Sequence, residues 1–415
     1  MAHPFPLSRF KIASADQIAT IRSLGLKRVR WEPRFSDVGG AADDGLNSSP
    51  GTSQPQGARR GDAALTAPAA TTAVPPGGVG ELASQAHRAQ LAQQRDALQR
   101  CERQFAEAAN ACAELNRLVT SQPVIAGDQA KALSRALVDK MLGEQDLCVQ
   151  LLTSSAGDKA SAHALNVTIM SLLLGRRLGL GDAEMQDLGV GAMLHDVGKL
   201  ELPERARQRE DHFIAAELKE YEDHVAHGVV QARKMGLPAS VLRVVAQHHE
   251  LCDGSGFPLR LAGDKMSLPS RIVALVNRYD NLCNPHLAAK ALTPHEALAL
   301  IFAGSAAQFD TAVLASFIKM MGVYPAGSAV QLNDDRFALV VNVNPARPLK
   351  PHVLVHDAQV PREEALMLDL QTQPGLCIRR SLKPLQLPPA VLNYLAPAQR
   401  VVYFFEPARE LDAAP

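Results

Sequence analysis

The pattern of apolar and polar residues divides the 415-residue chain into regions with different predicted structures. Residues 1–37 combine short alternating runs with one helical run, which predicts an accessory strand–helix–strand segment too small to be stable alone. Residues 38–80 are rich in Gly, Ala, Pro, Ser and Thr with few large apolar residues, and they predict a disordered linker. Residues 129–322 predict successive amphipathic helices, whereas residues 323–415 switch to period-two runs broken by proline, which are typical of a small β-rich domain.

Residues 81–128 predict a long helix with a heptad repeat. One heptad position holds Leu91, Leu98, Phe105, Cys112 and Val119, and the other holds Gln94, Cys101, Ala108 and Leu115. Such a stripe predicts either a coiled-coil homodimer through residues 84–119 or packing against the chain's own domain. The polar Gln94 leaves both alternatives open.

Composition favours a mainly α protein. Aromatic residues make up only 4% of the chain, so the core must be built from Leu, Val and Ala, and Leu and Ala are strong helix formers. Basic and acidic residues number 43 each, so no broad basic surface for a nucleic-acid polymer is indicated.

Cysteine usage and the lack of long apolar runs predict a cytoplasmic protein without a membrane partner. The six cysteines include no CxxC pair, which is typical of reduced thiols. The most apolar stretch, Val167 to Leu174, is far too short to span a bilayer. The N-terminus also lacks the charged-then-apolar order of a signal peptide.

The predicted helical region contains an unusual series of histidines. One histidine on an apolar helix is usually a core or surface residue, but several on successive helices indicate a metal site built from side chains that point inward. Imidazole and carboxylate ligands together suit iron, manganese or zinc, and a carboxylate can bridge two ions. The series consists of His163, His195 with Asp196, His224 with His227, and His248 with His249.

The order of these motifs resembles the HD-GYP branch of the HD superfamily of metal phosphohydrolases. HDVGK at residues 195–199 corresponds to the family's signature pair, and HHELCDGSGFP at residues 248–258 corresponds to HHExxDGxGYP with phenylalanine in place of tyrosine. HVAHG aligns His224 with the family's third histidine because Gly228 follows four positions later, and His227 is the alternative. The resemblance implies an HD-type helical bundle.

This resemblance implies a phosphodiesterase that hydrolyses cyclic-di-GMP to pGpG or GMP in bacterial signalling. Two divalent metal ions, iron or manganese with zinc or nickel as alternatives, would polarise the phosphodiester and activate water. The implied metal ligands are His163, His195, the bridging Asp196, His224, His248, His249 and, as a weak ligand, Asn277. The implied catalytic residues are Asp196 and Lys199, and Lys199 contacts a phosphate oxygen. The implied substrate-binding loop contains Asp253, Gly254, Gly256, Phe257 and Pro258.

Departures from the family pattern leave the activity open. Asn277 occupies the position of a family aspartate ligand, and a neutral amide oxygen binds a cation more weakly than a carboxylate does. Asp280, one helical turn away, is a candidate replacement. Lys159 stands where a third ion would need a ligand, so we expect no trinuclear site. The alternative function is a degenerate domain that binds a nucleotide, or a signalling protein such as a diguanylate cyclase, without turnover.

A second resemblance lies at the N-terminus. The pattern from His3 to Leu26 is similar to the second half of a small module often placed before HD-GYP domains. The absence of the first half predicts either its loss or a start upstream of Met1.

Overall fold

The structure is a computed structural model that describes residues 78–143, 146–153, 158–209, 213–304 and 306–407. The predicted accessory segment 1–37 and nearly all of the predicted linker 38–80 lie outside the described residues. The described residues 78–90 belong to one unit of the chain. The described residues from 91 onward belong to a second unit, which contains all of the histidine motifs.

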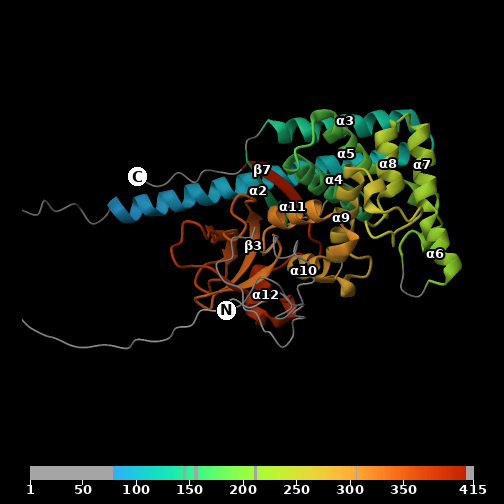
Figure 1. Ribbon diagram of the computed structural model, residues 1–415. Helices are drawn as coiled ribbons and strands as arrows, with labels where there is room; N and C mark the ends of the chain where they lie inside the picture. The colour runs from blue at the N-terminus through green and yellow to red at the C-terminus, as the bar shows by residue number, and fades with distance from the viewer. Residues whose placement is uncertain (1–77, 144–145, 154–157, 210–212, 305, 408–415) are drawn as a thin grey trace, which may run out of the picture. The chain divides into compact units, whose positions relative to one another are not determined.

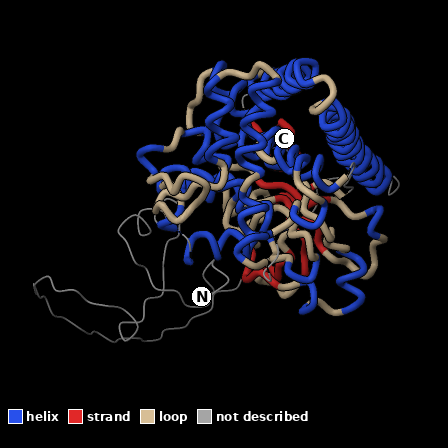
Figure 2. Tube along the Cα trace, turned by 90° about the vertical axis from the view of Figure 1, so that its right-hand side faces the viewer, coloured by secondary structure: helices blue, strands red, loops and turns tan. Residues whose placement is uncertain are grey.

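The predicted mainly α fold class is confirmed. The described α-helices are α2 (Gly78–Leu118), α3 (Pro123–Leu142), α4 (Lys159–Arg177), α5 (Asp182–Leu194), α6 (Ala215–Glu222), α7 (His224–Lys234), α8 (Ala239–Gln247), α9 (Leu268–Cys283), α10 (Pro294–Gly304), α11 (Thr311–Met321) and α12 (Pro389–Leu395). Helices α3–α8 gather on one side of the second unit, and the strands lie together beside them (Figures 1 and 2). None of the described helices is long and apolar enough to cross a membrane.

The strands form one antiparallel sheet in the order β5-β4-β3-β1-β7, with β2 paired to both β3 and β6. They are β1 (Leu147–Leu151), β2 (Ala329–Leu332), β3 (Phe337–Val343), β4 (His352–Val355), β5 (Met367–Asp369), β6 (Ile378–Leu382) and β7 (Tyr403–Pro407). Strands β2–β7 confirm the predicted C-terminal β-rich region. The sheet also includes β1, which lies within residues 129–322, the region predicted to be helical. All five residues of β1 are buried, so its sequence shows no period-two alternation.

Helix α4 lies at the centre of the helical part. Every residue from 164 to 175 is buried, whereas a surface helix buries only one stripe. The helix contacts α5, α9 and α11 as well as strand β7. Asp158 caps its N-terminus by accepting hydrogen bonds from the backbone N–H groups of Ala160 at 2.9 Å and Ser161 at 3.0 Å. This cap fixes the start of the helix just before His163.

The heptad stripe of α2 is buried inside the chain's own core. Its buried members include Cys101, Phe105, Ala108, Cys112, Leu115 and Val119. The Phe105 ring meets the Phe404 ring of β7 edge to face, with centroids 6.5 Å apart. The Gln94 amide pairs with the backbone of Met367 in β5, donating to its carbonyl at 3.3 Å and accepting from its N–H at 3.0 Å. This part of the stripe therefore packs against the chain's own strands, as one of the two alternatives predicted. A homodimer through residues 84–119 stays a prediction.

We expect Phe105→Ala to lower the free energy of unfolding by about 3–5 kcal/mol, because it removes a fully buried ring and leaves a cavity. Denaturant unfolding of the variant measures the loss. Glu107→Ala, an exposed position on the same helix, is the control and is expected to change stability little. Equal stability of the two variants would contradict an intramolecular role for the stripe.

Candidate metal centre

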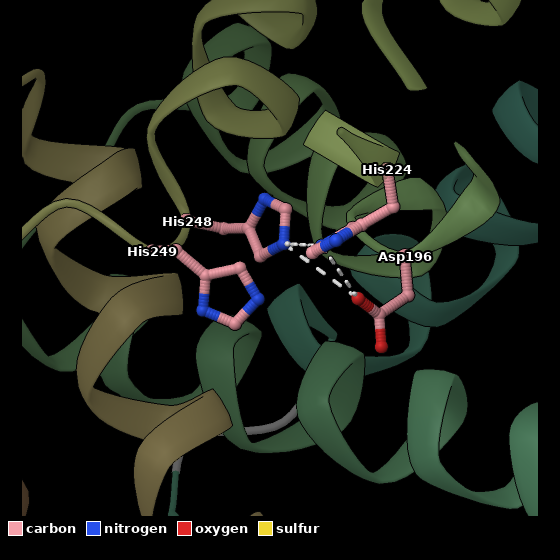
Figure 3. A group of neighbouring side chains, drawn as sticks. All are labelled: Asp196, His224, His248 and His249. Atoms are coloured by element: carbon pink, nitrogen blue, oxygen red, sulfur yellow. Dashed lines mark hydrogen bonds and ion pairs between the residues drawn. The ribbon is translucent and has the colours of Figure 1, made fainter. Parts of the chain in front are cut away.

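Five histidines and one aspartate converge from separate helices into two groups that share the aspartate. One group contains His163, His195 and Asp196, and the other contains Asp196, His224, His248 and His249. Within each group one ligand atom per residue lies within 4.8 Å of those of the others. Figure 3 shows the second group, with the His224 and His248 rings turned toward the aspartate. The structure therefore brings together every histidine and aspartate that the resemblance implied as a ligand.

The two oxygens of Asp196 face different pairs of imidazoles. Its Oδ2 lies 3.6 Å from Nε2 of His163 and 3.4 Å from Nε2 of His195. Its Oδ1 lies 3.5 Å from Nε2 of His224 and 3.6 Å from Nε2 of His248. This is the arrangement expected of a carboxylate that bridges two cations.

Three of the histidines are oriented by the ends of helices. In each of these histidines, Nδ1 lies next to the carbonyl oxygen of the residue three positions earlier. That carbonyl belongs to the last turn of α5 for His195, of α6 for His224 and of α8 for His248. These carbonyls are Ala192 O at 2.7 Å, Tyr221 O at 2.5 Å and Val245 O at 2.8 Å. Carbonyls in a last helical turn lack intrahelical partners, so they are free to accept. His227, the alternative ligand on α7, is exposed.

These contacts assign the tautomers. A carbonyl oxygen can only accept, so each of the three Nδ1 atoms carries a proton, and in the neutral imidazole Nε2 is then a bare lone pair. Nδ1 of His163 lies 2.5 Å from the carboxylate oxygen Oδ2 of Asp280, which leaves Nε2 of His163 bare as well. The bare Nε2 atoms face each other in pairs at 3.2 Å, His163 with His195 and His224 with His248.

The atoms of His163, His195, His224 and His248 that face one another beside Asp196 are therefore acceptors. Two facing lone pairs with no proton between them repel, and the nearby Asp196 Oδ1 is buried without a hydrogen-bond partner among the described residues. A shared cation relieves both defects, and neutral imidazole nitrogens with carboxylate oxygens suit a divalent transition metal. The residues present therefore fit a metal ion in each group.

Burial and neighbouring charges together keep three of the histidines and Asp196 in their metal-binding protonation states. Burial lowers the pKa of His224 to about 3 and also lowers the pKa of His195, although Asp196 opposes both shifts. Burial and the neighbouring imidazoles hold the pKa of His249 well below its usual value. Burial alone would raise the pKa of Asp196, but the charge of Lys199 and the contact with His195 hold it well below its usual value. At neutral pH the imidazoles of His195, His224 and His249 are therefore neutral, and the Asp196 carboxylate is charged.

Two glycines allow the backbone to close around the centre. A Cβ on Gly198 would lie 1.9 Å from the carbonyl oxygen of His224 and 2.4 Å from the backbone nitrogen of Gly228. The 3-10 turn Val197–Glu201 therefore packs directly against α7. This close approach brings His224 to Asp196, so the glycines of HDVGK and HVAHG have a packing role.

Lys199 lies within the centre. Its Nζ donates to Asp196 Oδ2 at 2.7 Å and lies 5.4 Å from the centroid of the Tyr221 ring. Burial alone would lower the pKa of Lys199, but Asp196 raises it above its usual value, so the ammonium stays charged. Tyr221, whose hydroxyl lies 3.4 Å from Nε2 of His249, was not identified from the sequence. Its position before HVAHG gave no separate signal.

The predicted substrate-binding loop is tied to His249. The Phe257 ring stacks on the His249 ring with centroids 4.5 Å apart, and the Phe257 N–H donates to the His249 carbonyl at 3.1 Å. Gly256 is buried, and a Cβ there would collide with the backbone of residues 249–251. The carboxylate of Asp253 accepts from the backbone N–H of Ser255 at 2.9 Å, which forms a turn.

The remaining predicted loop residues complete this turn. Gly254 adopts a φ of 76°, which favours glycine, and Pro258 is exposed. Sequence reasoning missed the role of Glu250, which is fully buried. Its two carboxylate oxygens accept from the backbone N–H groups of Leu259 at 2.6 Å and Leu261 at 2.8 Å, and so hold the far end of the loop.

Asn277 and Asp280, both on α9, have different surroundings. The side-chain oxygen of Asn277 accepts a hydrogen bond from Asn281 Nδ2 at 2.6 Å. Asp280 contacts Nδ1 of His163, on the opposite edge of that ring from Asp196. Asp280 therefore orients a ligand instead of replacing the missing carboxylate.

Comparison with known proteins identifies two families along the chain. A family model described as an HD domain matches residues 146–313, and a domain of unknown function, DUF3391, matches residues 1–130. The predicted resemblance to the HD-GYP family with an N-terminal accessory module is confirmed.

Curated relatives match part of the chain. A protein named cyclic di-GMP phosphodiesterase PA4108, from Pseudomonas aeruginosa, is 29% identical over 196 residues, which cover 46% of this chain and 47% of the relative. A 3'3'-cGAMP-specific phosphodiesterase 3 from Vibrio cholerae is 27% identical over 165 residues, covering 40% of this chain and 36% of the relative. The match thus spans less than half the length of either relative.

A solved structure also matches. Bd1817, a HDG"Y"P protein from Bdellovibrio bacteriovorus, aligns with a TM-score of 0.42 and 19% identity. The alignment covers 51% of this chain and 68% of that protein.

We expect Gly198→Ala to reduce the metal content of the purified protein, because the added Cβ collides with the backbone of α7 and displaces His224. Elemental analysis of the protein measures the metal, and thermal unfolding checks the fold. Gly304→Ala is the matched control, since its Cβ would make only an ordinary contact at 3.6 Å with a leucine side chain. Full metal content in Gly198→Ala would contradict the packing argument.

Proposed function

Because residues 146–313 form an HD domain of the HD-GYP family, we propose that this chain is a metal-dependent phosphodiesterase whose substrate is cyclic-di-GMP. The names of the relatives support a cyclic dinucleotide as the substrate class, and cyclic-di-GMP is our finer proposal. The observation that carries the proposal is the cluster of Nε2 atoms that face one another around Asp196, which is a donor set that suits a divalent cation.

The two groups would each hold one ion, and Asp196 would belong to both ligand sets. Divalent iron or manganese, with zinc or nickel as alternatives, would neutralise charge on the phosphodiester and lower the pKa of a water molecule. The low pKa values of the buried histidines keep their lone pairs available at neutral pH. Asp196, facing one pair of imidazoles with each oxygen, sets the spacing between the two groups.

Lys199 is the proposed catalytic cation. Its ammonium is held at Asp196 by a 2.7 Å contact, so it offers positive charge to a phosphate oxygen at the centre. The loop from Asp253 to Pro258 is the proposed substrate-binding element, because Phe257 stacks on the ligand His249. Hydrolysis would release the linear dinucleotide pGpG or, after a second cleavage, GMP.

One observation favours the alternative of a nucleotide sensor. The group of His163 and His195 contains three ligand residues, whereas the group of His248 contains four. Asn277, which resembles the family's additional ligand, has its oxygen engaged by Asn281. A weak first site would give a domain that binds a cyclic dinucleotide without turnover and passes the signal to a partner such as a diguanylate cyclase.

We expect Asp196→Ala to lose the bound metal and all hydrolysis of cyclic-di-GMP, because both groups lose their shared charged ligand. Protein purified without oxygen is analysed for metal and incubated with cyclic-di-GMP and added Mn²⁺ or Fe²⁺. His227→Ala, an exposed histidine on α7, is the matched control and should behave as wild type. Turnover retained in Asp196→Ala would refute the proposed site. Affinity for cyclic-di-GMP without product in the wild type would establish the sensor instead.

We expect Asn277→Asp to raise both metal occupancy and the rate of hydrolysis. A carboxylate adds the charge that the first site lacks, and it still accepts the hydrogen bond from Asn281. Mn²⁺ titration and initial rates measure the change against Asn110→Asp, an exposed asparagine-to-aspartate substitution on α2. If neither quantity rises above that control, residue 277 is not a ligand position.

A further inference from the structure

Asp280, which orients His163, is itself held by two asparagines. It is only 2% exposed, and its Oδ2 lies 2.5 Å from His163 Nδ1. Its Oδ1 accepts hydrogen bonds from the side-chain amides of Asn166 and, at 2.9 Å, Asn284. A buried carboxyl group needs hydrogen-bond partners for its oxygens, so the two amides stabilise the group that holds the ligand in place.

The backbone leading into strand β7 dictates how these amides are turned. The Val401 N–H donates to Asn284 Oδ1 at 2.8 Å, and the Tyr403 N–H donates to Asn166 Oδ1 at 2.9 Å. Because the amide oxygen of each asparagine is fixed by a backbone donor, its NH₂ group must face the other way. Those NH₂ groups donate to the Val401 carbonyl, at 2.8 Å from Asn284 and 3.4 Å from Asn166, and to Asp280.

The sheet and the core fix this segment in turn. Strand β7 pairs with β1 along its whole length, and the Val402 carbonyl accepts from the Leu152 N–H at 2.9 Å. The Tyr403 hydroxyl lies 3.0 Å from the Tyr279 hydroxyl and donates to the Ala326 carbonyl at 3.1 Å. The segment therefore presents its backbone groups to the two asparagines from a fixed position.

We infer that Val401–Tyr403 is a positioning element of the metal centre, which acts through Asn166, Asn284 and Asp280 to hold His163 with Nε2 toward Asp196. The inference rests on the proposed metal-binding function. Although 237 positions separate Asn166 from Tyr403, the C-terminal strand and the histidine bundle form one functional assembly. Within the described part of the chain, Asn166, Asn284 and Asp280 connect this segment to His163, so its role is positional.

The test is a Mn²⁺ titration of the metal-free full chain, followed by the electron paramagnetic resonance signal of the free ion. We expect two Mn²⁺ sites in the wild type. In Asn284→Ala the affinity of the His163 site should fall by about ten- to hundredfold, as is typical when a group that orients a ligand is removed. The other site should keep its affinity, because His224 and His248 are oriented by nearby helix carbonyls.

Two further variants separate positioning from general stability. Tyr279→Phe removes the contact between the Tyr279 and Tyr403 hydroxyls. The pairing of β7 with β1 and the Tyr403–Ala326 hydrogen bond still fix the segment, and the amides still hold Asp280, so both Mn²⁺ affinities should persist. In an Asp280→Asn background, Asn284→Ala should cause no further loss, because it acts through that carboxylate. Asn166→Ala tests the same relay if Asn284→Ala does not fold.

The outcomes are distinct. Unchanged Mn²⁺ affinity in Asn284→Ala, an equal loss in Tyr279→Phe, or an additional loss in the Asp280→Asn background overturns the inference and leaves the proposed function standing. A wild-type chain that binds no Mn²⁺ overturns both. A selective loss in Asn284→Ala that disappears in the Asp280→Asn background supports the positioning role.

Discussion

The electrostatics of the centre depend on the repulsion between lone pairs that the fold forces together. Two pairs of imidazole nitrogens face each other at 3.2 Å beside a buried carboxylate, and the protons that could separate them are engaged on the opposite edges of the rings. Without a cation this arrangement is unfavourable in a low-dielectric interior. The protein maintains it because the helices that carry the rings are held by a large apolar core.

That core determines how closely the helices can approach. The central helix α4 is buried on every side, and the HDVGK turn meets α7 at a distance that only glycine permits. The unpaired carbonyls of three helix ends then fix the tautomers of His195, His224 and His248. Features that ordinarily weaken a helix, namely its open carboxyl end and its glycines, thus serve to orient metal ligands.

Much of this centre could be predicted from the sequence because its motifs are local. HDVGK, HVAHG and HHE each place a histidine directly after a helical turn, and the spacing from His224 to Gly228 selects it over the exposed His227. The sequence could not reveal contacts between distant segments. Strand β1 has no alternation, Gln94 finds its partner in β5, and Asp280 meets His163 across 117 positions. Each depends on tertiary packing that no short pattern encodes.

The two ligand groups of the centre therefore differ in which parts of the chain orient their side chains. His224 and His248 are oriented by carbonyls three residues away, so their group depends little on the rest of the chain. His163 depends on Asp280, on two asparagines and on the backbone near the C-terminus. Asn277, where the family pattern has a carboxylate, lies on the same helix as Asp280. The group with fewer ligands, that of His163, is thus also the group whose geometry depends on distant parts of the fold. Substitutions in α9 or β7 should therefore displace the ligands of that group before those of the His224 group.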